Sequence, residues 1–213
     1  MTQSLTRAAR LQPQVEARFL AGAREASRFF MSKSNVHRTL ERLVDRLTEL
    51  EIPYAIVGAM ALNAYGYRRT TSDVDILVRR EGLESFKSAY LGRGYVEKFP
   101  GSKGLRDAAE NVTIDVLLTG EYPGDGREKP VVFPDPAEAA VRGERFALLP
   151  LEKLIELKLA SGMTAPHRLR DLADVIELIR VNELAEDLVA SLDPYVREKY
   201  RELWQAAQIR DDE

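Results

Sequence analysis

Two aspartates stand two positions apart in the short apolar segment Ser72–Val78. If this segment is a β-strand, Asp73 and Asp75 point to one face while Val74 and Ile76 point to the other. Two like charges side by side repel, and they contribute nothing to the packing of an apolar strand. A divalent cation would remove the conflict, and Mg²⁺ prefers hard oxygen ligands and keeps waters and substrate phosphates at its other positions. A surface position at a strand end is the alternative explanation.

A third aspartate, Asp115, interrupts another apolar segment, Thr113–Leu118. If the two segments form neighbouring strands, Asp115 can join Asp73 and Asp75 in a cluster of three carboxylates. Such a cluster can hold two metal ions, which stabilise both the attacking and the leaving oxygen of an in-line phosphoryl transfer. The aspartates therefore predict phosphoryl-transfer chemistry.

Gly58 marks the point where the short apolar segment 54–57 turns into a helix. A glycine lets the backbone approach a ligand closely, and the N–H groups at the start of a helix favour phosphate. A tight strand-to-helix turn without a ligand is the alternative. Between this glycine and the aspartates, Arg69 could contact phosphates or a nucleobase, and Thr71 could simply support the turn into the strand.

Lys158 lies in the apolar stripe of a helix expected from about 151 to 161, whereas Glu156 falls on a side expected to be solvated. An unpaired buried charge costs several kcal/mol, so this lysine either reaches solvent along its stem or meets an anion. A triphosphate or an acid of the metal cluster would serve. On the next helix, Asp171 and Asp174 are expected on a solvated face.

The elements that position these residues follow from hydrophobic periodicity and from Gly and Pro. Helices are expected at about 34–50, 59–65 and 83–91, strands at 54–57, 74–78, 95–99 and 146–149, a hairpin of 105–109 with 112–118 around Glu110-Asn111, and a loop at 119–130. After Pro150 the pattern is helical, at about 151–161, about 167–181 and in two shorter helices to about 207. The order predicts an α/β (α+β) fold with a C-terminal helical segment, residues 151–213.

Residues 1–31 are interpreted as an N-terminal helical extension, because apolar residues at helical spacing alternate with five arginines. An extension upstream of a natural start at Met31 is the alternative. The chain has no cysteine, which excludes disulfide frameworks, thiolate zinc sites and cysteine nucleophiles and suits a reducing cytoplasm. Its net charge of −3 gives no general attraction to nucleic acid or anionic membranes. No apolar run is long enough to span a bilayer, so no membrane partner is expected.

Taken together, three segments resemble the nucleotidyltransferase superfamily with the polymerase-beta-like core. They are 57–62 (VGAMAL), 65–75 (YGYRRTTSDVD) and 114–116 (IDV). Within that superfamily the chain is similar to AbiEii-type toxins of toxin–antitoxin systems and to related small nucleotidyltransferases. Its segments 157–160 (LKLA) and 168–174 (RLRDLAD) are similar to that group's K-L-x-A and R-x-K-D-x-x-D motifs. The resemblance runs from about residue 36 to about residue 181.

The resemblance implies a nucleotidyltransferase core with a mixed β-sheet at 32–150, closed by the helical segment. It implies Mg²⁺-dependent transfer of a nucleoside monophosphate from an NTP, such as ATP, to an acceptor hydroxyl on tRNA, a protein or a small molecule, with release of pyrophosphate. A toxin of this kind would have an antitoxin protein as its partner. Carried over by position, the metal ligands and catalytic residues are Asp73, Asp75 and Asp115, and the nucleotide-binding residues are Gly58, Ala59, Arg69, Thr71 and Lys158.

Two positions depart from the pattern of the superfamily. Ala59 stands where serine or glycine is usual, which removes a hydroxyl that could bind phosphate, and Arg170 stands where lysine is commoner. The alternative function is therefore a catalytically silent nucleotide-binding or regulatory module with the same fold.

Overall fold

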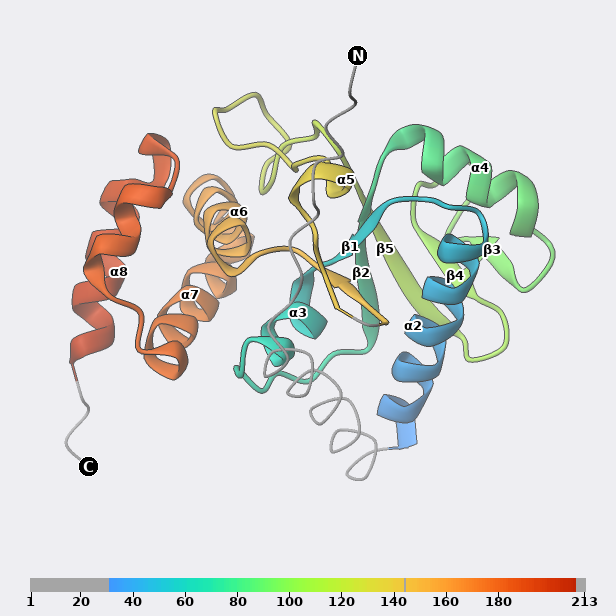
Figure 1. Cartoon of the computed structure of the whole chain (residues 1–213), viewed down its shortest axis with the longest axis horizontal. Coiled ribbons are helices and arrows are strands. Elements are labelled where there is room, and N and C mark those ends of the chain that lie inside the picture. The colour runs from blue at the N-terminus through green and yellow to red at the C-terminus, as the bar shows by residue number, and fades with distance from the viewer. Residues whose placement is uncertain (1–30, 144, 210–213) are drawn as a thin grey trace, which may run out of the picture.

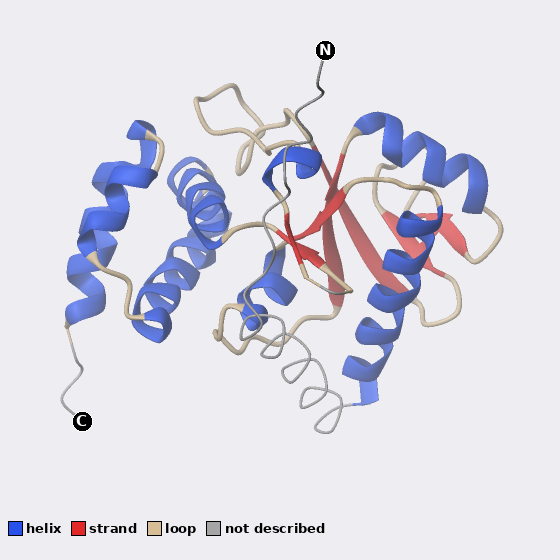
Figure 2. Ribbon diagram, in the orientation of Figure 1, coloured by secondary structure: helices blue, strands red, loops and turns tan. Residues whose placement is uncertain are grey.

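A seven-stranded mixed sheet organises the chain, in the strand order β3-β4-β5-β2-β1-β7-β6 (Figures 1 and 2). The strands are β1 (Tyr54–Ile56), β2 (Asp73–Val78), β3 (Tyr95–Glu97), β4 (Leu105–Asp107), β5 (Val112–Leu118), β6 (Val141–Arg142) and β7 (Ala147–Leu148). The pairs β2–β5 and β1–β7 are parallel, and the other neighbouring pairs are antiparallel. The computed structural model describes residues 31–143 and 145–209. The expected helical extension before residue 31 lies outside them.

Helices lie on both sides of this sheet in the view of Figure 1, with α2 and α4 on one side and α6, α7 and α8 on the other. Their bounds are α2 (Met31–Glu49), α3 (Gly58–Ala64), α4 (Arg80–Tyr90), α5 (Pro136–Ala139), α6 (Leu151–Thr164), α7 (Leu169–Asn182) and α8 (Arg197–Gln208), with 3₁₀ turns at Pro166–Arg168, Glu186–Ser191 and Pro194–Val196. The predicted α/β fold with a mixed sheet and a C-terminal helical segment is confirmed.

The two central strands show the alternation that the sequence predicts. Along β5, Ile114 and Val116 are buried while Asp115 is half-buried, and along β2 the buried Val74 separates the half-buried Asp73 and Asp75. Helix α2 packs against both strands. Burial of each large apolar side chain contributes about 1.5–3 kcal/mol, so this register is strongly fixed, because a slip by one residue would move the carboxylates into the core.

Two short elements were not predicted from the sequence. Helix α5 and strand β6 contain four and two residues, too few for a periodic pattern to appear. The strand expected at 95–99 ends at Glu97, and the strand expected at 146–149 spans only Ala147–Leu148. No helix among residues 31–143 and 145–209 is long and apolar enough to cross a membrane.

Helix α6 is buried over a wider arc than its apolar stripe predicts. The expected solvent exposure of Glu156 is wrong: its side chain is buried, and its Oε1 accepts a hydrogen bond of 2.7 Å from the backbone N–H of Asp193. The physical reason is that the 3₁₀ turn at Pro194–Val196 and helix α8 pack on α6 in addition to α7. Lys158 is buried as predicted.

Candidate active site

The parallel pairing of β2 with β5 brings the three aspartates together. Asp75 is the register partner of Asp115, and Asp73 is the partner of Thr113. Side chains at paired positions of neighbouring strands lie on the same face of the sheet, so all three carboxylates share one face. The prediction that the two strands are neighbours is confirmed.

A cavity of about 680 Å³ opens over this face. Its size is in the range of small-molecule binding sites. All eight residues predicted for the site line it: Gly58, Ala59, Arg69, Thr71, Asp73, Asp75, Asp115 and Lys158. The walls also include residues that were not predicted for the site, among them Lys98, Phe99, Ser161, Arg168 and Asp171.

Gly58 begins helix α3 directly against the carboxylate of Asp75. Its φ is +59°, in the left-handed region, and a Cβ at this position would lie 1.9 Å from Asp75 Oδ2. The backbone N–H of Val57 donates to the carbonyl oxygen of Asp75 at 3.1 Å, which fixes the two segments side by side. Residue 58 therefore has to be glycine both for its backbone conformation and for the space it leaves.

The carboxylate of Asp75 lies in a crowded negative environment. Burial raises the pKa of Asp75 to about 6, and the neighbouring carboxylates of Asp73 and Asp115 act in the same direction, against the positive charges of Lys158 and Arg168. No hydrogen bond from the described residues contributes to this balance. The site therefore favours a cation beside Asp75.

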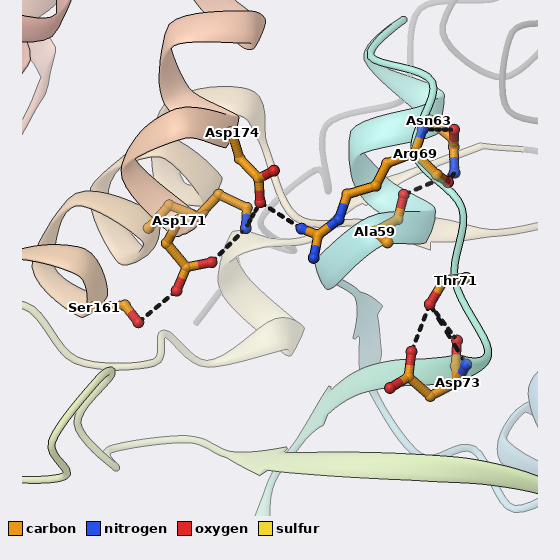
Figure 3. Close-up of polar contacts among 9 residues, drawn as sticks. Ala59, Asn63, Arg69, Thr71, Asp73, Ser161, Asp171 and Asp174 are labelled. Carbon is orange, nitrogen blue, oxygen red and sulfur yellow. Dashed lines mark hydrogen bonds and ion pairs between the residues drawn. The ribbon is translucent and has the colours of Figure 1, made fainter. Parts of the chain in front are cut away.

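The other two carboxylates already have partners. Thr71 Oγ1 donates to Asp73 Oδ1 at 2.5 Å (Figure 3), and Lys98 Nζ donates to Asp115 Oδ1 at 2.8 Å. Lys98 follows β3 and reaches Asp115 because β3, β4 and β5 form consecutive antiparallel pairs. Lys98 was not among the residues predicted for the site, although a meander of the three expected strands would place it near Asp115.

The chemistry of the three aspartates fits Mg²⁺. Three carboxylates on one face offer hard oxygen ligands, and the positive charge around them is not sufficient to balance them. In the part of the chain that the structure describes, no three His, Asp or Glu side chains are arranged to hold a metal ion as they stand. Thr71 and Lys98 each occupy an oxygen of this set. The metal site stays a prediction.

Charged side chains from α6, α7 and the loop before β2 form a cluster beside the cavity (Figure 3). Lys158 Nζ donates to Asp171 Oδ1 at 2.8 Å and to Asp174 Oδ2 at 2.7 Å. Arg69 donates to the same Asp174 oxygen at 2.5 Å, and Ser161 Oγ donates to Asp171 Oδ2 at 2.6 Å. This group of side chains joins helices α6 and α7 to the loop before β2.

The expectation that Asp171 and Asp174 lie on a solvated face is wrong. Asp174 is 1% exposed, because α7 packs on α6 with this face turned towards Lys158 and Arg69. Burial opposes the ionisation of Asp171, but Lys158 and the Ser161 hydroxyl outweigh it and hold the pKa of Asp171 below its ordinary value. The anion that the buried Lys158 requires is therefore supplied by the protein itself.

Asn63 holds the backbone that carries Arg69. Its Nδ2 donates to the carbonyl oxygens of Ala59 at 2.9 Å and Arg69 at 2.8 Å, and its Oδ1 accepts from the Arg69 N–H at 2.9 Å (Figure 3). These bonds clamp the segment between α3 and β2 onto α3. The sequence analysis gave Asn63 no role, because an asparagine inside a short helix carries no distinctive pattern.

No protein-family model matches the chain, and no curated protein is significantly similar to it.

Proposed function

We propose that the protein is a nucleotidyltransferase, which transfers a nucleoside monophosphate from an NTP to an acceptor hydroxyl and releases pyrophosphate. The observation that supports this most directly is the convergence of Asp73, Asp75 and Asp115 on one face of a cavity beside Gly58. The resemblance to the superfamily with the polymerase-beta-like core, including the AbiEii-type group, points to the same reaction. We also propose that the chain belongs to that superfamily.

In this reaction the acceptor hydroxyl oxygen attacks the α-phosphorus, the bond from that phosphorus to the bridging oxygen breaks, and pyrophosphate leaves. Asp73, Asp75 and Asp115 are the residues that would hold Mg²⁺, which when bound neutralises negative charge on the phosphates and the attacking oxygen. The hydroxyl proton goes to a carboxylate, for which we propose Asp115. One of its oxygens accepts from Lys98, and the other is available to the proton.

Other residues that line the cavity are suited to the phosphates of the NTP. Gly58 and Ala59 present backbone with little side-chain bulk at the cavity, and Lys158, Arg69 and Arg168 bring positive charge to it. Lys158 and Arg69 already share Asp174. Asp174 holds these two cations in position and also neutralises part of their charge. They should therefore attract a polyphosphate less strongly than two unpaired cations would.

The proposal is tested by incubating the purified chain with Mg²⁺, each labelled NTP and candidate acceptors and measuring pyrophosphate release. Asp73→Asn and Asp75→Asn should each abolish release, because the amide cannot supply the negative charge that a metal ligand needs. Asp187→Asn is the matched control, since Asp187 is exposed and lies outside the cavity. Undiminished release by both cavity variants would refute the proposal.

A catalytically silent nucleotide-binding or regulatory module is the second candidate. The observation that favours it is that Arg69, Lys98 and Lys158 are all paired with acids of the site, and that Ala59 supplies no hydroxyl. Such a module would bind an NTP without releasing pyrophosphate. Pyrophosphate release that depends on the aspartates eliminates it.

The proposed reaction also needs an acceptor molecule, and the proposal extends to a protein partner and a cellular compartment. We propose that the acceptor hydroxyl belongs to tRNA, a protein or a small molecule and that, if the chain is a toxin, an antitoxin protein holds it inactive. The absence of cysteine suits a reducing compartment. We therefore propose that the reaction takes place in the cytoplasm.

A further inference from the structure

In the structure, Lys98 forms an ion pair with the carboxylate of Asp115. Its Nζ lies 2.8 Å from Asp115 Oδ1, at the register position directly beside Asp75. We infer that Lys98 is a built-in competitor of the divalent cation: its ammonium holds Asp115 until the metal displaces it. The inference rests on the proposed function, because it assumes that the three aspartates form a metal site.

The local structure directs this ammonium towards Asp115. Lys98 lies in the connection between β3 and β4, and its backbone N–H donates to the carbonyl oxygen of Gly104 at 3.1 Å. A Cβ at residue 104 would lie 2.6 Å from Lys98 Cδ, so the absence of a side chain at Gly104 leaves the space in which the lysine stem runs. The stem is thus guided from the hairpin to the carboxylate.

The Lys98–Asp115 ion pair is exposed enough for another cation to replace the ammonium. The Lys98 and Asp115 side chains are 34% and 42% exposed, whereas those of Lys158 and Asp174 are 9% and 1% exposed. An exposed pair is worth about 0.2–1 kcal/mol, while the loss of a partner from a buried pair costs several times more. Of these two lysines, Lys98 is therefore the one that an incoming ion can displace.

The Lys98 ammonium and a divalent metal ion compete for the Asp115 carboxylate, and their charges favour the metal. Lys98 carries one positive charge and contacts one carboxylate. A divalent cation carries two charges, and at the proposed site it would be bound by Asp115 together with Asp73 and Asp75, which lie on the same face of the sheet. The metal must nevertheless break the Lys98–Asp115 pair in order to use Asp115. Removal of the lysine charge should therefore strengthen metal binding rather than weaken it, which is opposite to the effect expected if Lys98 only maintained the shape of the site.

The experiment measures the metal directly, without turnover. Mg²⁺ is titrated against the full chain while the unfolding temperature is followed, and Mn²⁺ is titrated while free Mn²⁺ is measured by electron paramagnetic resonance. Lys98→Met removes the ammonium and keeps an unbranched stem, and Lys98→Arg keeps a cation. Lys103→Met is the matched control, because Lys103 lies on the same connection and lines the same cavity but pairs with Glu121.

We expect Lys98→Met to tighten binding of both metals by about three- to fivefold, which corresponds to the loss of a half-exposed ion pair. Lys98→Arg should bind like the wild type, and Lys103→Met should change affinity less than Lys98→Met. Equal affinities for the wild type and Lys98→Met, weaker binding by Lys98→Met, or equal gains from the two methionine variants would overturn the inference. If neither the wild type nor Lys98→Met binds metal at all, the metal site of the proposed function fails and the inference fails with it.

Discussion

Gly58 and Asp75 lie so close together that residue 58 has no room for a side chain. A Cβ on Gly58 would stand 1.9 Å from Asp75 Oδ2, and the φ of +59° is one that other residues adopt only with strain. The contact links the two ends of the site, because Gly58 begins the helix proposed to face the phosphates and Asp75 is the central carboxylate of the proposed metal site.

Gly58→Ala should displace the Asp75 carboxylate and thereby abolish both Mg²⁺-dependent stabilisation and pyrophosphate release. Gly92→Ala is the matched control, because Gly92 has a similar φ of +72° and a Cβ added there would meet nothing within 4 Å. It isolates the cost of the left-handed backbone, about 1–2 kcal/mol. Chemical denaturation should show a larger loss for Gly58→Ala, and equal losses together with retained release would contradict the role of the contact.

Asp174→Asn should destabilise the fold by about 3–5 kcal/mol, because Lys158 and Arg69 would lose the buried carboxylate that they share. The free energy of unfolding from urea denaturation measures the effect. Asp187→Asn, a change on the exposed surface, should stay within about 0.5 kcal/mol of the wild type. A similar result for the two variants would show that the cluster does not hold α6 and α7 to the core.

The pH dependence of stability should depend on Asp75. Its pKa rises from 3.8 to about 6 on folding, so the folded state binds more protons than the unfolded state between these values. The stabilisation associated with the protonated form is complete below about pH 4 and is lost as the pH rises through about 6. Without divalent cations, Asp75→Asn should therefore be more stable than the wild type at pH 7–8, by on the order of 2–3 kcal/mol.

That difference between Asp75→Asn and the wild type should shrink towards pH 4, because the wild-type carboxyl is then neutral in the folded state and no longer carries the penalty of a buried charge. Mg²⁺ should reverse the order at pH 7.5 by stabilising only the wild type. Unfolding temperatures measured with and without a chelator from pH 4 to pH 8 provide the data. A difference that is independent of pH would contradict the assigned shift.

Asn63→Ala should loosen the segment that carries Arg69 and Thr71, since three hydrogen bonds to Ala59 and Arg69 are lost. A cost of about 1–3 kcal/mol is expected for the loss of these part-buried hydrogen bonds. Asn63→Asp keeps the acceptor for the Arg69 N–H but places a carboxylate oxygen against two carbonyls, so it should be at least as harmful at pH 7. NTP affinity and unfolding free energy are measured together, and no change in either would contradict this role.

The sequence predicted the strands and helices around the site well because their signals are local. Alternation along 112–118 and the paired aspartates at 73 and 75 determine which side chains share a face, and one residue of slip would bury charge. The same reasoning predicted that Lys158 is buried. It was wrong about Asp171, Asp174 and Glu156, because helical periodicity does not show how many neighbours will cover a helix.

By itself, the sequence determined the alternating faces of the central strands, the glycine at the strand-to-helix turn and the apolar stripe that buries Lys158. Only the tertiary structure decided which charges meet: Lys98 with Asp115, and Arg69 with Asp174 across 105 positions of the chain. The physical reason is that periodicity is a local property: it shows which side chains share one face of a helix or strand. The partner of a charge depends instead on how distant elements dock, and here the packing of α7 on α6 and of β3–β4 on β5 made that choice.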